Sequence, residues 1–174
     1  LCTEITQNMS PTIVEEEKVE DGKIITVKTP GDFVVCNLSS ISLARAERAG
    51  ILDRLIPIQV RMLDNVIDLN QIPVLQAQIT NQSYRGIGLG TFGWHHLLAL
   101  KGIKWESEEA VQFCDELYEK IALLTIKASM DLAKEKGAYP GFAGSDWQSG
   151  QYFTSRGYVS DDWKDLKEAV GQHG

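Results

Sequence analysis

The sequence predicts an α/β fold, and two patterns lead to that prediction. Residues 13–35 contain short runs rich in β-branched and aromatic residues, which are typical of strands. From residue 52 onward, apolar residues recur every three or four positions, which is typical of helices that pack through one face. The chain has 174 residues, a length that suits one domain or a piece of one. Strands and helices are therefore expected to mix within a single domain over residues 1–174.

Two strands are expected near the amino end, over residues 23–28 ("KIITVK") and 32–38 ("DFVVCNL"). The Asp21-Gly22 pair before the first run is a hairpin-turn signal, and "TPGD" marks a second turn between the runs. The acidic stretch Glu15–Asp21 is expected to be a solvated loop, because charged residues dominate it.

Two helices are expected in the middle of the chain. The first, over Leu52–Leu69, gathers its apolar residues on one stripe. That stripe comprises Leu55, Ile56, Val60, Leu63, Val66 and Ile67. Pro57 is tolerated only in the first turn of a helix, so it should lie there. The second helix should span Pro73–Gln82, since proline suits the first helical position.

The Gly-rich stretch Tyr84–Gly93 is expected to be extended and to run into a helix that Gly102 ends. The longest helix should follow Ser107, a good N-cap, and should stop at Gly137. Its apolar stripe comprises Val111, Cys114, Leu117, Ile121, Leu124, Ala128 and Leu132.

The carboxyl end is aromatic and Gly-rich before it becomes helical again. Residues 138–158 are expected to form a loop, and a last short helix should begin near residues 160–162 and end by Gly171. No internal repeat and no low-complexity linker divides the sequence.

Charge and composition narrow the classes of function. The formal net charge is −7 and no cluster of five Lys or Arg occurs, which argues against a nucleic-acid partner or an anionic membrane surface. No apolar run reaches the roughly 18 residues of a membrane span, and no signal peptide is visible, so we expect a cytoplasmic protein. The three cysteines are odd in number and widely spaced, which fits neither a disulfide scaffold nor a zinc site.

Three features have more ordinary explanations than chemistry. The run "GIGLGTFG" (86–93) matches neither phosphate-binding fingerprint, so close backbone packing explains it better. His95 and His96 are adjacent and would point about 100° apart on a helix, so they cannot share a metal ion. Cys114 lies on an apolar stripe, where a buried structural thiol is expected.

Cys2, Glu4 and Cys36 remain as candidates for catalysis. In an extended segment, Cys2 and Glu4 would point to the same side. The carboxylate would raise the pKa of the thiol, so a thiolate nucleophile fits poorly. A neutral thiol that transfers a hydrogen atom fits better, because the neighbouring carboxylate can accept a proton from the substrate in the same event.

Four stretches together resemble one enzyme family. In order, "LCTEI", "VCNLSSISL", "YRGIGLGTFGWHHLLALKG" and "KASMDLAKEKGAYPGF" resemble the large (alpha) subunit of ribonucleoside-diphosphate reductase, most like the class I bacterial enzymes. The resemblance covers essentially the whole chain, while the family's subunit is several times longer. It therefore implies an internal stretch of a ten-stranded α/β barrel, with the family's Asn just before Leu1 and more barrel after "GQHG".

The resemblance implies a role for five residues. Cys2 matches the thiol that becomes a thiyl radical and takes the 3′ hydrogen of the ribose, and Glu4 matches the base for the 3′-hydroxyl. Cys36 matches one of two thiols that end as a disulfide, and its partner would lie upstream. Leu38 falls where the family contacts substrate through its backbone, and Leu1 is expected to contact substrate beside Cys2.

Cofactors and partners follow from the same resemblance. No metal is expected in this chain; a metal-containing small (beta) subunit would supply the radical, and thioredoxin or glutaredoxin would reduce the disulfide. ATP and dNTP effectors would bind elsewhere in the full-length subunit, which would be a homodimer that makes DNA precursors from ribonucleoside diphosphates. The isolated chain is expected to be inactive, because one redox thiol and the phosphate-binding loop have no match in it.

Three geometric expectations accompany this interpretation. Cys2 and Cys36 should lie close together, the Glu15–Lys28 segment should project outward between them, and Cys114 should be remote and buried. Two alternatives stay open. One is an adenosylcobalamin-dependent (class II) reductase, which shares the Cys-x-Glu logic. The other is a non-catalytic helical interaction domain whose cysteines are merely buried.

Overall fold

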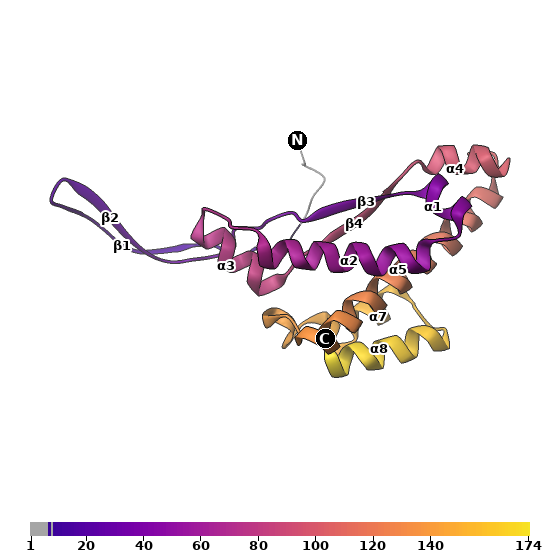
Figure 1. Cartoon of the computed structure of the whole chain (residues 1–174). Helices are drawn as coiled ribbons and strands as arrows, with labels where there is room; N and C mark the ends of the chain where they lie inside the picture. Colours follow the sequence, from indigo (N-terminus) through magenta and orange to yellow (C-terminus); the bar gives the residue numbers. More distant parts are fainter. Residues whose placement is uncertain (1–6, 8) are drawn as a thin grey trace.

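A long hairpin begins the described part of the chain, two parallel strands follow with three helices between them, and the remaining elements are helical (Figure 1). The computed structural model describes Gln7 and residues 9–174. The strands are β1 (Ile13–Glu20), β2 (Lys23–Thr29), β3 (Leu38–Ser42) and β4 (Gly88–Phe92). The helices are α1 (Leu43–Ala49), α2 (Leu52–Leu69), α3 (Leu75–Tyr84), α4 (Trp94–Lys101), α5 (Glu108–Lys136), the 3₁₀ turn η1 (Pro140–Phe142), α6 (Asp146–Ser149), α7 (Gln151–Arg156) and α8 (Asp161–His173).

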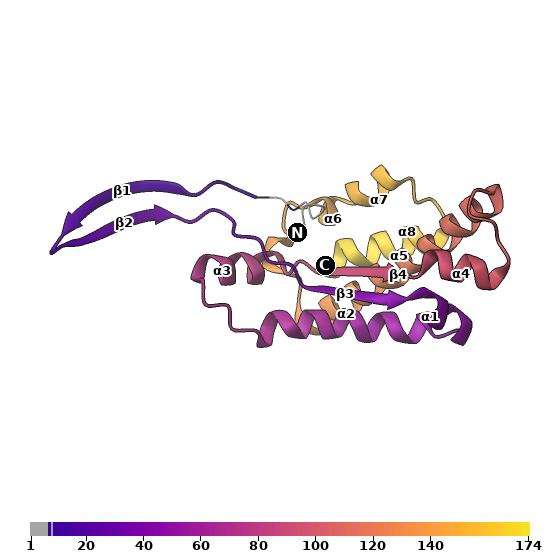
Figure 2. The ribbon, with the colours of Figure 1, turned by 90° about the horizontal axis from the view of Figure 1, so that it is seen from above.

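The hairpin of β1 and β2 extends away from the helices (Figure 2). Asp21 (φ 50°) and Gly22 (φ 72°) both have positive φ, as a type I′ turn requires, so the predicted turn is confirmed. The acidic stretch Glu15–Asp21 is solvated as predicted, since every residue of both strands is exposed. Its assignment as a loop is wrong, because residues 16–20 of this stretch pair with β2.

The second predicted strand is displaced. Residues 32–37 form no strand, and β3 begins at Leu38. The backbone of this segment bonds to other partners: Asp32 N donates to Ser10 O (3.0 Å), and Phe33 N donates to Thr80 Oγ1 (2.9 Å). Composition could not reveal these distant partners, so the run of β-branched residues predicted a ladder that does not form.

The strands β3 and β4 pair in parallel, from Leu38 opposite Gly88 to Ser42 opposite Phe92. Helices α2 and α5 pack on one another beneath the core face of this pair (Figures 1 and 2). The buried cluster comprises Ile41, Leu43, Ala44, Ala46, Leu52, Ile56, Val60, Leu97, Leu117, Ile121, Ala128 and Leu132. Ile87, just before β4, and Leu89, within β4, pack against the same cluster. One face of the strand pair therefore contacts the core.

The bounds of α2 are those predicted, and its stripe is largely confirmed. Ile56, Val60, Leu63 and Ile67 are buried, whereas Leu55 is half-buried and Val66 is exposed. Pro57 occupies the sixth position of the helix and not its first turn. The helix continues through it because residues on both sides of the proline, Leu52 and Val60 among them, are fixed in the core.

The helix α3 is shifted from its prediction, while the two helices that follow agree with theirs. Pro73 lies before α3 and not in it, because Val74 is the N-cap. The N-cap Ser107 accepts a hydrogen bond from Ala110 N (3.1 Å), as expected for the start of α5, and Gly137 ends that helix. Gly102 likewise ends α4 in the left-handed region (φ 71°).

A second core joins the carboxyl-terminal helices to the latter half of α5. It comprises Ile126, Met130, Phe142, Phe153, Trp163, Leu166 and Val170. The loop predicted for residues 138–158 is therefore wrong in part, because this stretch forms η1, α6 and α7, with Phe142 and Phe153 buried and its other aromatic residues half-buried against the same core. The last helix also continues past Gly171 to His173, since a glycine in a final turn costs only about 1 kcal/mol.

No helix in the described part of the chain is long and apolar enough to cross a membrane.

Candidate functional site

Cys36 and Leu38 lie on the face of the strand pair opposite the core. Exposure alternates along this segment: Cys36 is exposed, Asn37 is 6% exposed, Leu38 is 57% exposed and Ile41 is buried. Side chains two apart in an extended segment share a face, so Cys36 and Leu38 point the same way. We call this surface, formed by Cys36, Leu38, Ser40, Gly88 and Gly90, the open face.

Glycines form the β4 side of the open face. Gly88 and Gly90 are the ladder partners of Leu38 and Ser40. A Cβ atom on Gly88 would lie 2.5 Å from Leu38 Cδ2, whereas one on Gly90 would lie 3.6 Å from Ser40 Oγ. Close packing, the explanation favoured for the Gly-rich run, is thus confirmed at Gly88. On this face the Leu38 side chain covers Gly88, whereas backbone is accessible beside Ser40 at Gly90.

Gln7 connects the amino-terminal segment to Cys36. Its Nε2 atom lies 3.4 Å from Val35 O and 3.5 Å from Cys36 Sγ, with the amide as donor in both contacts. Gln7 follows Glu4 by three residues and Cys2 by five. Leu1, Cys2 and Glu4 themselves lie outside the described residues, so the predicted proximity of Cys2 to Cys36 stays a prediction.

The base of the hairpin is closed by Asp32. Its Oδ2 atom accepts hydrogen bonds from Ser10 N (2.7 Å), Ser10 Oγ (2.9 Å) and Tyr84 Oη (3.2 Å). These bonds hold the pKa of Asp32 below the ordinary aspartate value, and the Ser10 backbone N–H contributes most. The predicted outward course of Glu15–Lys28 is therefore confirmed, as a hairpin that leaves from this closed base.

The structure also places Cys114 and the two adjacent histidines. Cys114 is half-buried and not buried, because the apolar stripe of α5 extends beyond the elements that cover it: Val111, one turn earlier, is 71% exposed. His95 and His96 are both exposed, and the described residues contain no group of three or more His, Cys, Asp or Glu that could hold a metal ion.

Comparison with known proteins gives the family. The chain matches the family described as ribonucleotide reductase, barrel domain, over residues 1–174. The chain belongs to this family. The parallel pair β3–β4, joined through α1, α2 and α3, is consistent with part of an α/β barrel, so the predicted fold class is confirmed.

Individual relatives agree with that assignment. The ribonucleoside-diphosphate reductase subunit alpha of Treponema pallidum (strain Nichols) is 51% identical over 180 residues, which cover all of this chain and 21% of that protein. The subunit alpha of Helicobacter pylori (strain ATCC 700392 / 26695) is 38% identical over 170 residues, covering 88% of this chain and 22% of that protein. The chain thus spans about a fifth of the length of these relatives.

One relative carries a name that states a dependence on vitamin B12. The vitamin B12-dependent ribonucleoside-diphosphate reductase of Mycobacterium tuberculosis (strain CDC 1551 / Oshkosh) is 40% identical over 115 residues, covering 63% of this chain and 17% of that protein. Both named kinds of reductase therefore occur among the relatives of this barrel segment.

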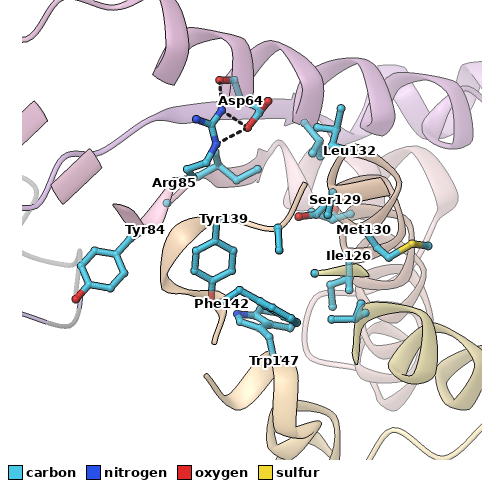
Figure 3. Close-up of a pocket in the computed structure, with 18 of the residues that line it drawn as sticks. Asp64, Tyr84, Arg85, Ile126, Ser129, Met130, Leu132, Tyr139, Phe142 and Trp147 are labelled. Atoms are coloured by element: carbon cyan, nitrogen blue, oxygen red, sulfur yellow. Dashed lines mark hydrogen bonds and ion pairs between the residues drawn. The ribbon is translucent and has the colours of Figure 1, made fainter. Parts of the chain in front are cut away.

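This ribonucleotide reductase segment contains a cavity of about 870 Å³ (Figure 3), and neither Cys36 nor Leu38 lines it. Its apolar wall includes Ile126, Met130 and Phe142.

On the polar wall of this cavity, Arg85 pairs with Asp64 and with Asp68 (Nη1 to Oδ1, 2.7 Å). These pairs raise the pKa of Arg85, chiefly through the hydrogen bond to Asp68, and Lys136 pairs with the same two carboxylates. The charges on this wall therefore neutralise one another.

Proposed function

We propose that this chain is the segment of a ribonucleotide reductase large (alpha) subunit that carries the radical thiol and one redox thiol. The full-length subunit would reduce ribonucleoside diphosphates to deoxyribonucleotides for DNA synthesis. The observation that carries the proposal is the contact of Gln7 with Cys36 (3.5 Å), because it brings the segment just after Cys2-x-Glu4 beside an exposed thiol.

In the proposed reaction, Cys2 and Glu4 act on the 3′ carbon of the ribose. A thiyl radical at Cys2 takes the 3′ hydrogen atom and becomes a neutral thiol, which leaves the radical on the 3′ carbon. Glu4 accepts the 3′-hydroxyl proton, the role of a positioned general base. Loss of the 2′-hydroxyl as water is then easy, because the electron density left at the 3′ carbon helps to expel it.

Cys36 would supply half of the reducing equivalents. Cys36 and a second thiol of the full-length subunit give up two hydrogens and become a disulfide, while the 2′ carbon exchanges its hydroxyl for hydrogen and releases water. The 3′ hydrogen then returns from Cys2, which regenerates the thiyl, and Glu4 gives its proton back to the 3′ oxygen. Thiol–disulfide exchange with thioredoxin or glutaredoxin would reset the disulfide. Exposure of Cys36 on the open face supports this role.

Substrate and partner contacts complete the proposal. Leu38 would contact the nucleotide through its backbone, and Leu1 would do so beside Cys2. A small (beta) subunit with a metal site would supply the radical, since no side chain makes a thiyl unaided. ATP and dNTP effectors would bind elsewhere in a homodimeric, cytoplasmic subunit.

A dependence on adenosylcobalamin is the second candidate, and the vitamin B12-dependent relative of Mycobacterium tuberculosis favours it. The two candidates differ in the source of the radical. The discriminating measurement is deoxynucleotide formation by the full-length subunit with either a small subunit or adenosylcobalamin added. Activity with adenosylcobalamin alone would contradict the class I proposal.

The experiment that tests the proposed function compares three cysteine variants of the full-length subunit. We expect Cys2→Ser to abolish turnover, because an alcohol O–H bond is too strong to give up its hydrogen to the radical relay. Cys36→Ser should prevent repeated turnover, since no disulfide can form. Cys114→Ser is the matched control and should keep activity within a few-fold of the unmodified subunit. Equal activity in all three variants would refute the assignment.

A further inference from the structure

Asn37 stands between the proposed redox thiol and Leu38, and its side chain points the opposite way from both. Within the described part of the chain, the buried polar side chains are Asn37, Thr80 and Asn81, with 6%, 5% and 5% of their surface exposed. A buried amide is stable only when it is hydrogen-bonded. The partners of Asn37 therefore decide how this segment is held.

The Asn37 side chain makes two hydrogen bonds that fix its orientation. Its Nδ2 atom donates to Asn81 Oδ1 (2.9 Å), on α3, and to Gly86 O (3.1 Å), just before β4. A backbone carbonyl can only accept, so the nitrogen of Asn37 must be the atom that faces Gly86. It follows that Asn81 presents its oxygen to Asn37.

The backbone of Asn37 is held as well. Its carbonyl oxygen accepts a hydrogen bond from Gly88 N (2.8 Å), at the first residue of β4. Asn37 is thus tied to α3, to the segment before β4 and to β4 itself. We call these three hydrogen bonds the Asn37 clamp.

We propose that Asn37 is a positioning residue that directs Cys36 Sγ and the backbone of Leu38 toward the open face. Neighbouring side chains in an extended segment point to opposite sides, so a clamp that pulls Asn37 inward turns Cys36 and Leu38 outward. The catalytic consequence rests on the proposed function. A displacement of about 1 Å in a reacting group can lower a rate about 10²-fold, so loss of the clamp should lower turnover more than substrate affinity.

Two substitutions with the same chemistry test the clamp from its two ends. Asn37→Asp replaces the donor by a carboxylate that faces the Gly86 carbonyl, so the two side-chain hydrogen bonds of the clamp are lost and only the backbone bond to Gly88 remains. Asn81→Asp puts a carboxylate where an acceptor already stands, so Asn37 can still donate to it. Both changes bury the same new charge at positions of nearly equal exposure. Asn37→Ser, which is too short to reach both partners, gives the same prediction without adding charge.

Thr80→Val is the control for a general loss of stability. Thr80 Oγ1 accepts from Phe33 N (2.9 Å), so this change removes a buried hydrogen bond between α3 and the same connecting segment. It leaves the Asn37 clamp intact. Any effect shared by Thr80→Val and the Asn37 variants therefore reports stability and not positioning.

The experiment measures hydrogen–deuterium exchange and turnover in the full-length subunit. We expect Asn37→Asp and Asn37→Ser to speed amide exchange at Leu38 and Gly88 about tenfold or more, and to lower kcat about 10–10²-fold with a smaller change in KM. Asn81→Asp and Thr80→Val should leave both readouts within a few-fold of the unmodified subunit.

The two proposals fail in different ways. If the Asn37 variants change exchange and kcat no more than Thr80→Val does, the positioning role is overturned. If the unmodified subunit makes no deoxynucleotide, the proposed function fails, and exchange at Leu38 and Gly88 still decides whether Asn37 orders this segment. Faster exchange confined to the Asn37 variants would support the clamp even then.

Discussion

The side chain of Leu38 occupies the space that a Cβ atom on Gly88 would need, with its Cδ2 atom 2.5 Å from that position. The two residues are ladder partners on the open face. Gly88→Ala should therefore move Leu38 to a less favourable rotamer and lower the unfolding free energy by about 0.5–1.5 kcal/mol, because the displaced atom is the flexible end of a side chain that is 57% exposed. Denaturant unfolding of the 174-residue chain measures this change.

The matched control for that substitution is Gly90→Ala. Its new Cβ atom would lie 3.6 Å from Ser40 Oγ, an ordinary contact, so the unfolding free energy should change by less than about 0.5 kcal/mol. Equal destabilisation by the two changes would show that contact with Leu38 is not what requires glycine at position 88.

Arg85 should contribute more to stability than Arg61, although both form pairs with carboxylates. Arg85 has 21% of its side chain exposed and bonds Asp64 and Asp68, so Arg85→Ala should cost about 1–3 kcal/mol. Arg61 pairs with Glu135 at an exposed site, where ion pairs contribute little, so Arg61→Ala should have a smaller effect. Denaturant midpoints of both variants test this order, and a larger effect at Arg61 would contradict it.

The base of the hairpin should loosen at acid pH. The pKa of Asp32 is lowered on folding by its hydrogen bonds, chiefly from Ser10 N. A lowered pKa gives a contribution to stability that is present above the ordinary aspartate pKa of about 4 and is lost as pH falls through the lower, folded value. The amide shift and exchange of Ser10 should titrate in that acid range. Asp32→Asn should remove the titration, and its persistence in that variant would rule out Asp32 as the cause.

Glu4 should act as a base and not only as a loop carboxylate. In the full-length subunit, Glu4→Gln keeps the shape of the side chain but cannot accept the proton as a carboxylate does. We expect kcat to fall about 10²–10⁴-fold, the usual effect of losing a positioned general base, with a much smaller change in substrate affinity. Turnover within a few-fold of the unmodified subunit would show that Glu4 has no such role.

The sequence predicted the elements whose signals are local. Helix α2 has the predicted bounds, and Ser107 and Gly137 limit α5 as expected, because caps and apolar stripes act within a few residues. The displaced strand at residues 32–37 depended on a distant partner, Thr80, that no local pattern reveals. Cys114 was expected to be buried and is half-buried. The prediction failed because periodicity identifies an apolar stripe but does not show how far other elements cover it.

The candidate site was predictable only in part for the same reason. Cys36 and Leu38 were identified as site residues through the resemblance to the reductase alpha subunit. Their shared face follows from the alternation of side chains along an extended segment. Asn37 and Gln7 were missed, since their importance lies in contacts with Asn81, Gly86 and Cys36. The sequence held one signal for Asn37: in "VCNL" this polar residue lies between Cys36 and Leu38, so alternation turns it toward the core, where its amide needs hydrogen-bond partners.

The distance between two sulfur atoms decides whether this segment holds the proposed active site. The measurement is a crystal structure of the full-length subunit with a ribonucleoside diphosphate bound. Because both thiols must reach a single ribose, which is only a few ångströms across, we expect Cys2 Sγ and Cys36 Sγ to lie within about 10 Å of each other, facing the sugar. A larger separation, or a nucleotide bound away from the open face, would contradict the assignment of Cys2 and Cys36 to one site.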